Sequence, residues 1–290
     1  ETSDTTFASI DHLKRIRSLY YGNISLIDKG VGRILDTLDE LGMAENTLVI
    51  FTSDHGELLG DHGAFQKSKP YEASMRIPFL MRLPGQVAPG KTTADRVNML
   101  DIMPTALELA ELDYPGENIL PGACLLDQEG GGLAVSRDMF VVEHGAGPRR
   151  WLSLLRGPWK YNYYFEGGWR ELFQLEDDPL EMHNLLLNEP DVHSLERSQS
   201  MHQQLIDWEM ENGFASSFSS SGDLIASPID ERPPSTTNNQ YPTWVENLPP
   251  DELLKMESPG ASTLNAMASE WTYSLEDLNL RAFKDGGGSF

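Results

Sequence analysis

The sequence predicts an α/β fold, and three features carry that prediction. Between Leu13 and Leu41 apolar residues recur at alternating steps of three and four, as on one face of a helix. After Gly42, the continuous apolar run of residues 48–51 is typical of a buried parallel strand. Short β-like runs between residues 139 and 175, separated by Gly-Pro and Gly-Gly turns, indicate a small antiparallel sheet. We therefore expect a mostly parallel sheet with flanking helices, followed by an antiparallel subdomain.

Residues 1–126 make up the first predicted region. Its long helix carries a stripe of apolar side chains: Leu13, Ile16, Tyr20, Ile24, Ile27, Val31, Ile34, Leu38 and Leu41. A second strand is expected at residues 79–81, directly after Pro78. Asp101 is expected to cap a further helix, whose apolar residues are Ile102, Met103, Ala106, Leu107 and Ala110.

Residues 127–212 form the second predicted region, which begins with a glycine linker at residues 130–132. The expected strands span residues 139–142, 151–156, 159–165 and 171–175. A helix from about residue 191 to 210 closes this sheet, with Val192, Leu195, Leu205 and Trp208 turned toward it. The aromatic residues of the strands are expected to pack in the core instead of forming a sugar-binding wall: Trp151, Trp159, Tyr161, Tyr163 and Tyr164.

Residues 213–290 are expected to form an extended, partly disordered tail. The Ser-rich residues 214–222 and the polar residues 233–239 are interpreted as exposed connections. Residues 244–256 and 271–283 contain enough apolar side chains to dock on the globular part.

Composition limits the possible partners of the chain. The formal net charge of its 290 residues is -23, which argues against a surface that neutralises the phosphates of nucleic acid. No apolar run has the length of a membrane span. Cys124 is the single cysteine, so no intrachain disulfide is possible, and the compartment stays undecided. Since the chain starts with Glu1, a preceding segment is expected.

The segment Thr52-Ser53-Asp54-His55-Gly56-Glu57 is the most informative for function, because it begins where the first predicted strand ends. Ligand sites of open α/β sheets form at the carboxyl ends of strands. Asp54 and His55 therefore form a candidate metal site, since a carboxylate beside an imidazole can bind a divalent cation. The alternative is a hydrogen-bonded pair that only stabilises the turn.

In its wider setting, this segment resembles the second metal motif of type I sulfatases, which belong to the alkaline phosphatase-like superfamily. The resemblance includes residues 46–78 as a whole, the helix of residues 21–36 before them, and the helix of residues 101–110 after them. Residues 171–185 are similar to the strand and turn that close the C-terminal subdomain of the family. The resemblance as a whole covers about residues 20–208, which implies the C-terminal part of a sulfatase.

The resemblance implies roles for Asp54, His55 and Lys67, and His62 is a further candidate in the same loop. Asp54 and His55 would be two of the four protein ligands of one divalent cation, usually calcium, with manganese or magnesium as alternatives. Lys67 would reach the sulfate oxygens and stabilise charge that develops during transfer. His62 would donate a proton to the leaving alcohol or orient the loop, and orientation is our preferred reading.

For four further polar residues, a structural role is considered beside or instead of a functional one. Glu57 is either an acceptor for a ligand imidazole or a brace of the turn. Glu72 and Arg76 are expected to pair with each other, and His144 is expected to be a surface histidine rather than a catalytic one.

The nucleophile of the family is missing from the sequence. Type I sulfatases convert a Cys or Ser within a Cys/Ser-x-Pro-x-Arg segment to formylglycine, and no such segment occurs here. Cys124 lacks the downstream proline and arginine and is interpreted as a small buried hydrophobic residue. We therefore expect this chain alone to be inactive.

The resemblance implies a sulfuric ester hydrolase that acts on a sulfated small molecule or a sulfated glycan, and export from the cytoplasm is expected with it. The alternatives are a phosphonate or phosphate monoester hydrolase of the same superfamily and a sulfatase-derived module without catalytic function. The combination of Asp54, His55 and Lys67 argues against the module, which would have no chemical need for them together.

Overall fold

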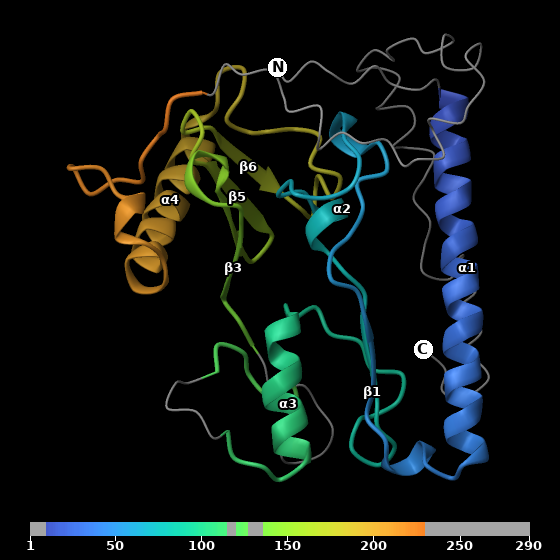
Figure 1. The fold of residues 1–290 in the computed structure, drawn as a ribbon. Coiled ribbons are helices and arrows are strands. Elements are labelled where there is room, and N and C mark those ends of the chain that lie inside the picture. Colours follow the sequence, from blue (N-terminus) through green and yellow to red (C-terminus); the bar gives the residue numbers. More distant parts are fainter. Residues whose placement is uncertain (1–9, 115–119, 127–135, 230–290) are drawn as a thin grey trace. The chain divides into compact units, whose positions relative to one another are not determined.

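A computed structural model describes residues 10–114, 120–126 and 136–229 of the chain (Figure 1). The described residues divide into two compact units. One unit contains residues 10–55 and the described residues between 77 and 137, and the other contains residues 56–76 and 138–229. The boundaries expected after residues 126 and 212 stay predictions.

The first unit begins with the long helix expected from the apolar stripe. Helix α1 spans Ile10–Glu40 and is followed by a turn in which Gly42 has φ of 66°, a conformation that favours glycine. Leu13 of the predicted stripe is buried, but four other residues of the stripe are exposed: Tyr20, Ile27, Ile34 and Leu41. Leu35, which is not part of that stripe, is also buried. The helix is therefore confirmed, while much of its apolar face is uncovered in the structure of this chain.

Strands β1 (Val49–Thr52) and β2 (Phe79–Arg82) lie where the sequence predicts them, after the short 3-10 helix η1 (Ala44–Asn46). They pair with each other antiparallel, with Val49 opposite Arg82 and Thr52 opposite Phe79. The expectation of parallel pairing is thus wrong for these two strands. A continuous apolar run indicates a buried strand, but it does not indicate whether the strand pairs parallel or antiparallel. In this structure both strands are only partly buried.

Asp101 stands before helix α3 (Ile102–Leu109), as the sequence predicts, but its side chain does not cap that helix. The buried carboxylate accepts hydrogen bonds from the Asn98 and Ala123 backbone N–H groups and forms an ion pair with Arg137. The bond from Asn98 belongs to a capping box around the 3-10 helix η3 (Met99–Asp101). Asp101 therefore ties together three segments of this unit.

The second unit contains the predicted antiparallel sheet. Its strands are β3 (Met139–His144), β4 (Trp151–Arg156), β5 (Trp159–Tyr164) and β6 (Arg170–Gln174), each paired with the next in the chain. Gly157 has φ of 53° in the tight turn between β4 and β5. The short 3-10 helix η4 (Gly147–Arg149) connects β3 to β4.

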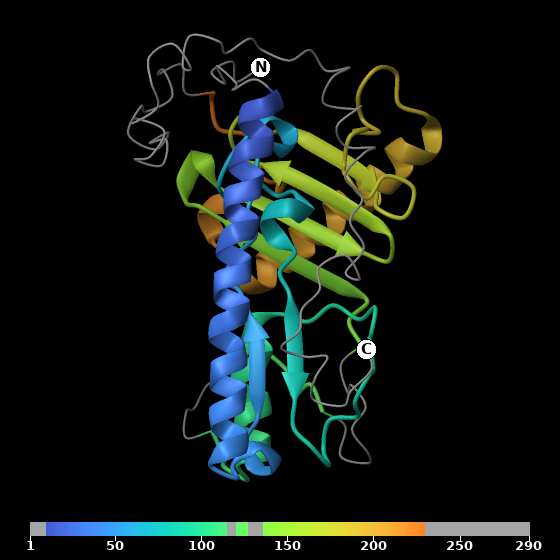
Figure 2. The same cartoon turned by 90° about the vertical axis from the view of Figure 1, so that its right-hand side faces the viewer.

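Helix α4 (Val192–Asn212) packs on one face of this sheet (Figure 2). Its buried positions include Met201, Leu205 and Ile206, which join Tyr161 and Tyr163 in the core. The sequence prediction is right for Leu205 and Trp208, which belong to this core or pack against it, and wrong for Val192 and Leu195, which are exposed. The helix turns small residues of its first half inward instead, since Ser194 and Ser198 are buried.

Four of the five aromatic residues of the strands have the packing role expected for them, and Tyr164 does not. Trp151, Tyr161 and Tyr163 are buried, and Trp159 packs against the core cluster. Tyr164 is partly buried and donates a hydrogen bond to Glu171.

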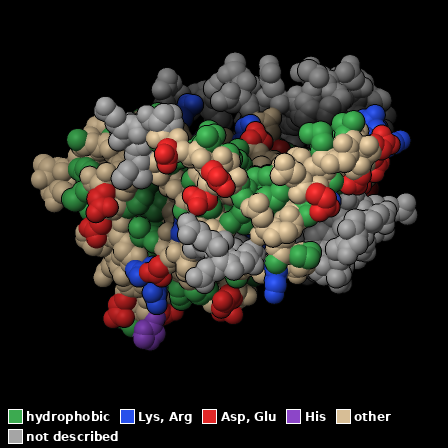
Figure 3. All heavy atoms as spheres, turned by 90° about the horizontal axis from the view of Figure 1, so that it is seen from below, with side chains coloured by type: hydrophobic (Ala, Val, Ile, Leu, Met, Phe, Trp, Pro, Cys, Tyr) green, Lys and Arg blue, Asp and Glu red, His purple; other side chains and the backbone are tan. Residues whose placement is uncertain are grey.

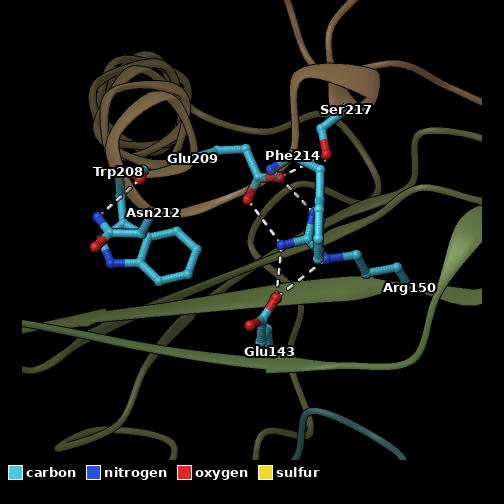
Figure 4. Close-up of polar contacts among 7 residues, drawn as sticks. All are labelled: Glu143, Arg150, Trp208, Glu209, Asn212, Phe214 and Ser217. Carbon is cyan, nitrogen blue, oxygen red and sulfur yellow. Dashed lines mark hydrogen bonds and ion pairs between the residues drawn. The ribbon is translucent and has the colours of Figure 1, made fainter. Parts of the chain in front are cut away.

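An ion-pair network, buried at Arg150 and Glu209 and open to solvent at Glu143, attaches α4 and the chain after it to the sheet (Figure 4). The Arg150 guanidinium lies between Glu143 of β3 and Glu209 of α4, with nitrogen–oxygen distances of 2.6 Å and 2.5 Å. Ser217 donates a hydrogen bond to Glu209 and accepts one from Arg150. Although burial acts against a charged Glu209, the hydrogen bonds from Arg150 and Ser217 outweigh it and lower the pKa of this carboxyl group.

This network corrects part of the expectation that residues 214–222 form an exposed connection. Six of these residues are exposed as expected, but others dock on the unit. The 3-10 helix η5 (Ala215–Ser217) contains the buried Ser217, and Phe218 packs against the core. Further along, Leu224 is buried, and the Tyr163 hydroxyl group donates hydrogen bonds to the carbonyl groups of Leu224 and Ile225. Ser-rich composition concealed the apolar residues that dock here. The linker at residues 130–132 and the segments 233–239, 244–256 and 271–283 lie outside the described residues.

The surface agrees with the acidic composition. Asp and Glu side chains are spread over the face drawn in Figure 3, between hydrophobic and uncharged ones. Within the described ranges, no helix is long and apolar enough to cross a membrane. Cys124 is partly buried, less than expected for a small buried hydrophobic residue, and its thiol group lies 3.6 Å from the Leu126 carbonyl oxygen.

Candidate functional site

Asp54 and His55 lie directly after β1, at the position the sequence predicts for them. The His55 Nε2 atom is 3.3 Å from Asp54 Oδ2, and the two side chains are 34% and 75% exposed. The His55 backbone N–H donates to Asp54 Oδ1, and the Ser53 hydroxyl group donates to the His55 carbonyl oxygen. Local hydrogen bonds therefore hold a carboxylate and an imidazole next to each other at the end of a strand.

This pair combines donors suitable for a divalent cation. A carboxylate oxygen and an imidazole nitrogen are both common metal ligands, and both side chains have exposed surface. Among the described residues, no group of three or more His, Cys, Asp or Glu side chains is arranged to hold a metal ion. Two ligands alone would bind a hard cation weakly.

The loop that carries His62 and Lys67 belongs to the other unit and has an unusual backbone. Four non-glycine residues within it have positive φ: Leu59 at 48°, His62 at 51°, Gln66 at 66° and Ser68 at 74°. The Glu57 carboxylate accepts hydrogen bonds from the Leu59 and Gln66 backbone N–H groups. Glu57 thus acts as a brace of the turn, which is one of the two readings of the sequence. Such sparsely populated conformations persist only where their surroundings fix them.

His62 lies in the 3-10 helix η2 (Asp61–Gly63), and its imidazole stacks on the Tyr71 ring. The two ring centroids are 3.7 Å apart, with an angle of 7° between the planes. Burial lowers the pKa of His62 below its ordinary value, so the neutral imidazole predominates at neutral pH. Stacking and a neutral ring are both suited to a residue that orients the loop.

Lys67 is exposed and stands between Gln66 and Ser68, two of the residues with positive φ. The Trp151 indole of β4 donates a hydrogen bond of 3.1 Å to the Ser68 carbonyl oxygen, which ties the backbone beside Lys67 to the sheet. An exposed ammonium group on a fixed backbone is suited to binding an anion.

Buried charges attach the end of this loop to the sheet. The Lys160 ammonium group of β5 is fully buried and lies 2.6 Å from Glu181 Oε1 and 3.1 Å from Glu72 Oε1. Glu72 opens the short helix α2 (Glu72–Met75), and its backbone N–H donates to Glu181 Oε2. Beside them, the Tyr71 hydroxyl group donates to Glu171 of β6. The expected pairing partner of Glu72 was Arg76, whereas the structure brings Glu72 to Lys160.

The sequence prediction missed Lys160 because it assigned the strands of the sheet a packing role. It missed Glu171 and Glu181 because it interpreted residues 171–185 only as a strand and turn that close the subdomain. One signal was present: within β5, Lys160, Asn162 and Tyr164 alternate with Trp159, Tyr161 and Tyr163. Residues two apart share a face of a strand, so this alternation indicates a polar face opposite the apolar one. Both faces of β5 are in fact buried, and the polar one faces the loop.

A cavity of about 300 Å³ lies beside His62 and the start of α2. It is lined by Asp61, His62, Glu72, Ala73, Arg76, Pro179, Leu180 and Glu181. The connection between β6 and α4 therefore contributes to the surroundings of His62. His144, in contrast, is exposed and stacks on Trp151, in agreement with its reading as a surface histidine.

The buried carboxyl group of Glu181 predicts a pH dependence of stability. Burial raises its pKa to about 7, although Lys160 acts in the opposite direction. Because the pKa in the folded state lies above the ordinary value of 4.5, the folded protein binds this proton more tightly than the unfolded chain does. The resulting contribution to the free energy of unfolding is fully present below about pH 4.5. This contribution is lost as the pH rises through about 7.

We therefore expect the free energy of unfolding of the wild type to fall relative to that of Glu181→Gln between about pH 5 and about pH 8. Denaturant unfolding of both proteins at these two pH values measures the difference. A difference that stays constant, or that grows in favour of the wild type at high pH, would contradict the prediction.

Comparison with known proteins supports the resemblance found in the sequence. Residues 1–112 match the family described as Sulfatase. An arylsulfatase of Clostridium perfringens is 37% identical over 180 residues, which cover 61% of this chain and 37% of the relative. A choline-sulfatase of Rhizobium meliloti is 36% identical over 184 residues, covering 61% of this chain and 34% of the relative. The chain thus spans little more than a third of the length of these two curated relatives.

Two solved structures are similar to the fold. The first is BT4656 in complex with its substrate D-glucosamine-2-N,6-O-disulfate, with a TM-score of 0.57 and 25% identity over 65% of this chain and 40% of the other. The second is the phosphonate monoester hydrolase of Agrobacterium radiobacter, with a TM-score of 0.59 and 26% identity over 69% of this chain and 42% of the other.

Proposed function

Because this chain belongs to the sulfatase family, we propose that it supplies the C-terminal portion of a metal-dependent hydrolase that cleaves sulfate esters. The observation that carries the proposal is the segment of residues 52–76. It presents a carboxylate and an imidazole at a strand end, and then a cationic side chain on a loop that buried charges attach to a sheet. The covalent step would belong to a formylglycine in a further part of the complete enzyme, so the chain by itself is expected to be inactive.

The residues after β1 fit a divalent cation. Asp54 would supply a carboxylate oxygen and His55 an imidazole nitrogen, and the 3.3 Å between these side chains allows both to face one ion. Calcium is our preferred cation, with manganese and magnesium as alternatives. When bound, the cation supplies positive charge that stabilises the sulfate group as its ester bond breaks.

Lys67 would bind the sulfate oxygens through its ammonium group. A sulfate monoester carries one negative charge, and a cation on a pre-arranged loop needs little reorganisation to meet it. His62 would keep the loop in shape through its stack on Tyr71. A neutral imidazole lacks the extra proton of a strong acid, which favours this orienting role over proton donation.

A phosphonate monoester hydrolase is the second candidate function, and the likeness to the enzyme of Agrobacterium radiobacter favours it. Its TM-score of 0.59 is close to the 0.57 of the structure with a disulfated glucosamine, so the fold alone does not separate the two activities. The curated relatives named above are both sulfatases, which is why sulfate is our preferred group. A sulfated small molecule or sulfated glycan is the proposed substrate class, and the disulfated glucosamine bound by BT4656 supports it.

The complete gene product is expected to prefer sulfate to phosphorus. Its kcat/KM for 4-nitrophenyl sulfate should exceed those for 4-nitrophenyl phosphate and for a 4-nitrophenyl phosphonate ester. Nitrophenolate release, measured by absorbance on all three esters, makes the comparison. A higher kcat/KM for the phosphonate ester would assign the protein to the second candidate function.

Replacing Lys67 by methionine is expected to lower kcat/KM for the sulfate ester by about 100- to 1000-fold, because the transition state loses a fixed positive charge. Steady-state rates of the complete gene product measure the loss. Lys29→Met removes another lysine, from α1, and serves as the control. Equal rates for the Lys67→Met variant and the wild type would exclude a catalytic contact.

A further inference from the structure

Lys160 is buried more deeply than a lysine normally is, and the proposed chemistry gives it no contact with substrate. Its side chain is 0% exposed, and its ammonium group forms ion pairs with Glu72 and Glu181. Taking an ammonium group out of water costs several kcal/mol, and apolar residues of similar volume often pack at least as stably as a buried ion pair. Stability alone therefore gives no reason for a charge at this position.

The partners of Lys160 connect it to the loop that carries His62 and Lys67. Glu72 follows directly on Tyr71, on whose ring His62 stacks. One carboxylate oxygen of Glu181 lies 2.6 Å from the Lys160 ammonium nitrogen. The other accepts a hydrogen bond of 2.6 Å from the Glu72 backbone N–H. Lys160 thus holds both the side chain of Glu72 and the carboxylate that holds its backbone.

Other contacts of the same loop reach the same sheet. The Tyr71 hydroxyl group donates to Glu171 at 2.9 Å, and Tyr164 and Asn162 donate to the other oxygen of that carboxylate. Trp151 donates to the Ser68 carbonyl oxygen. Strands β4, β5 and β6 all contribute to these contacts, which fall on residues 68–72 of the loop.

The loop depends on such anchors because its own backbone is strained. Positive φ values at Leu59, His62, Gln66 and Ser68 cost free energy that the surrounding contacts must offset. Several backbone amides of the loop donate to carbonyl oxygens within it. The Leu58 amide donates to Gln66, the Gly60 amide to Ala64, and the Ala64 amide to Asp61. Loosening the anchored end at residues 68–72 would let this strained segment relax and would move Lys67.

We propose that Lys160 is a positioning residue, which holds the loop of His62 and Lys67 in its working shape through Glu72 and Glu181. The small antiparallel sheet is then a support for the sulfate-binding loop, and its buried polar face has a functional reason. The inference rests on the proposed function for its catalytic consequence, while the anchoring itself can be tested without any activity.

The test uses the complete gene product with Lys160→Met. Because this substitution leaves the buried Glu181 carboxylate and the partly buried Glu72 carboxylate without their cation, the double variant Lys160→Met/Glu181→Gln is also made. Arg156→Met is the matched control, since Arg156 is a partly exposed cation of the neighbouring strand that pairs with Asp138 and Gln204. Two quantities are measured: hydrogen exchange of the amides of residues 58–66, and kcat and KM on 4-nitrophenyl sulfate.

Exchange at these loop amides is expected to rise at least about tenfold in both Lys160 variants, while the amides between β3 and β4 keep wild-type rates. The kcat is expected to fall by about 10- to 100-fold with a smaller change in KM, because a displacement of about 1 Å can cost 100-fold in rate. The Arg156→Met control should match the wild type in both quantities.

Wild-type exchange in a folded Lys160→Met variant would overturn the anchoring. If that variant does not fold, wild-type exchange in the double variant would overturn it equally. Faster exchange with an unchanged kcat would overturn the catalytic consequence. If the Lys160 variants show faster exchange but the wild type itself releases no sulfate, the proposed function is contradicted and the anchoring stands.

Discussion

Asp54→Ala in the complete gene product is expected to lower kcat/KM for sulfate ester hydrolysis by about 1000-fold or more, which corresponds to about 4 kcal/mol of transition-state stabilisation. The physical reason is the loss of a charged oxygen ligand. His55 alone would supply one neutral nitrogen from this segment, so the cation should bind far more weakly. Steady-state rates and metal content, measured on the same preparation, test both parts.

Asp138→Ala is the matched control for this prediction. Asp138 and Asp54 have equally exposed side chains, at 75%, and Asp138 pairs with Arg156 outside the candidate segment. The control is expected to keep wild-type activity and metal content. If Asp54→Ala binds the cation as well as the wild type does, Asp54 is not a ligand, and the reading of the pair as a turn-stabilising feature is correct.

The second large effect is expected at Arg150, where methionine should reduce the free energy of unfolding by about 3–5 kcal/mol. The substitution leaves Glu209, whose side chain is 0% exposed, buried without its counter-ion. It also removes the guanidinium group from contact with the rings of Phe165 and Phe214, which lie 5.1 Å and 5.2 Å from its centre. Denaturant unfolding with tryptophan fluorescence measures the change.

Arg156→Met again provides the comparison, because its partner Asp138 is exposed and an exposed ion pair contributes about 0–1 kcal/mol. Hydrogen exchange adds a local test: amides of residues 214–218 should lose protection in Arg150→Met, since Ser217 and Phe214 bind the Glu209 carboxylate. A loss below about 1 kcal/mol would show that Glu209 finds other partners or water.

The sequence predicted the parts of the fold that repeat a simple pattern. Helix α1 and the strands of the antiparallel sheet were predicted correctly because each follows its own periodicity, although much of the α1 stripe is exposed. Strand direction was wrong for β1 and β2, since an apolar run is compatible with either direction. The prediction for the tail was wrong where Ser217, Phe218 and Leu224 dock among exposed serines.

The candidate site was predictable only where its residues are neighbours in the chain. Asp54 with His55 and His62 with Lys67 fall within one motif, so a resemblance could find them. Lys160, Glu171 and Glu181 meet that loop from 88 to 109 positions away in sequence, through contacts that depend on the fold. An isolated lysine in a strand gives little sign of such a contact, because most lysines are exposed.

If this chain contributes cation ligands to an enzyme that hydrolyses sulfate esters, turnover must depend on a bound metal ion. Sulfate release by the complete gene product is therefore measured before chelation with EDTA, after it, and after calcium is restored. We expect release to stop with the chelator and to recover with the cation. Sulfate release that continues unchanged after all bound metal has been removed would contradict a role for Asp54 and His55 as ligands of a catalytic cation.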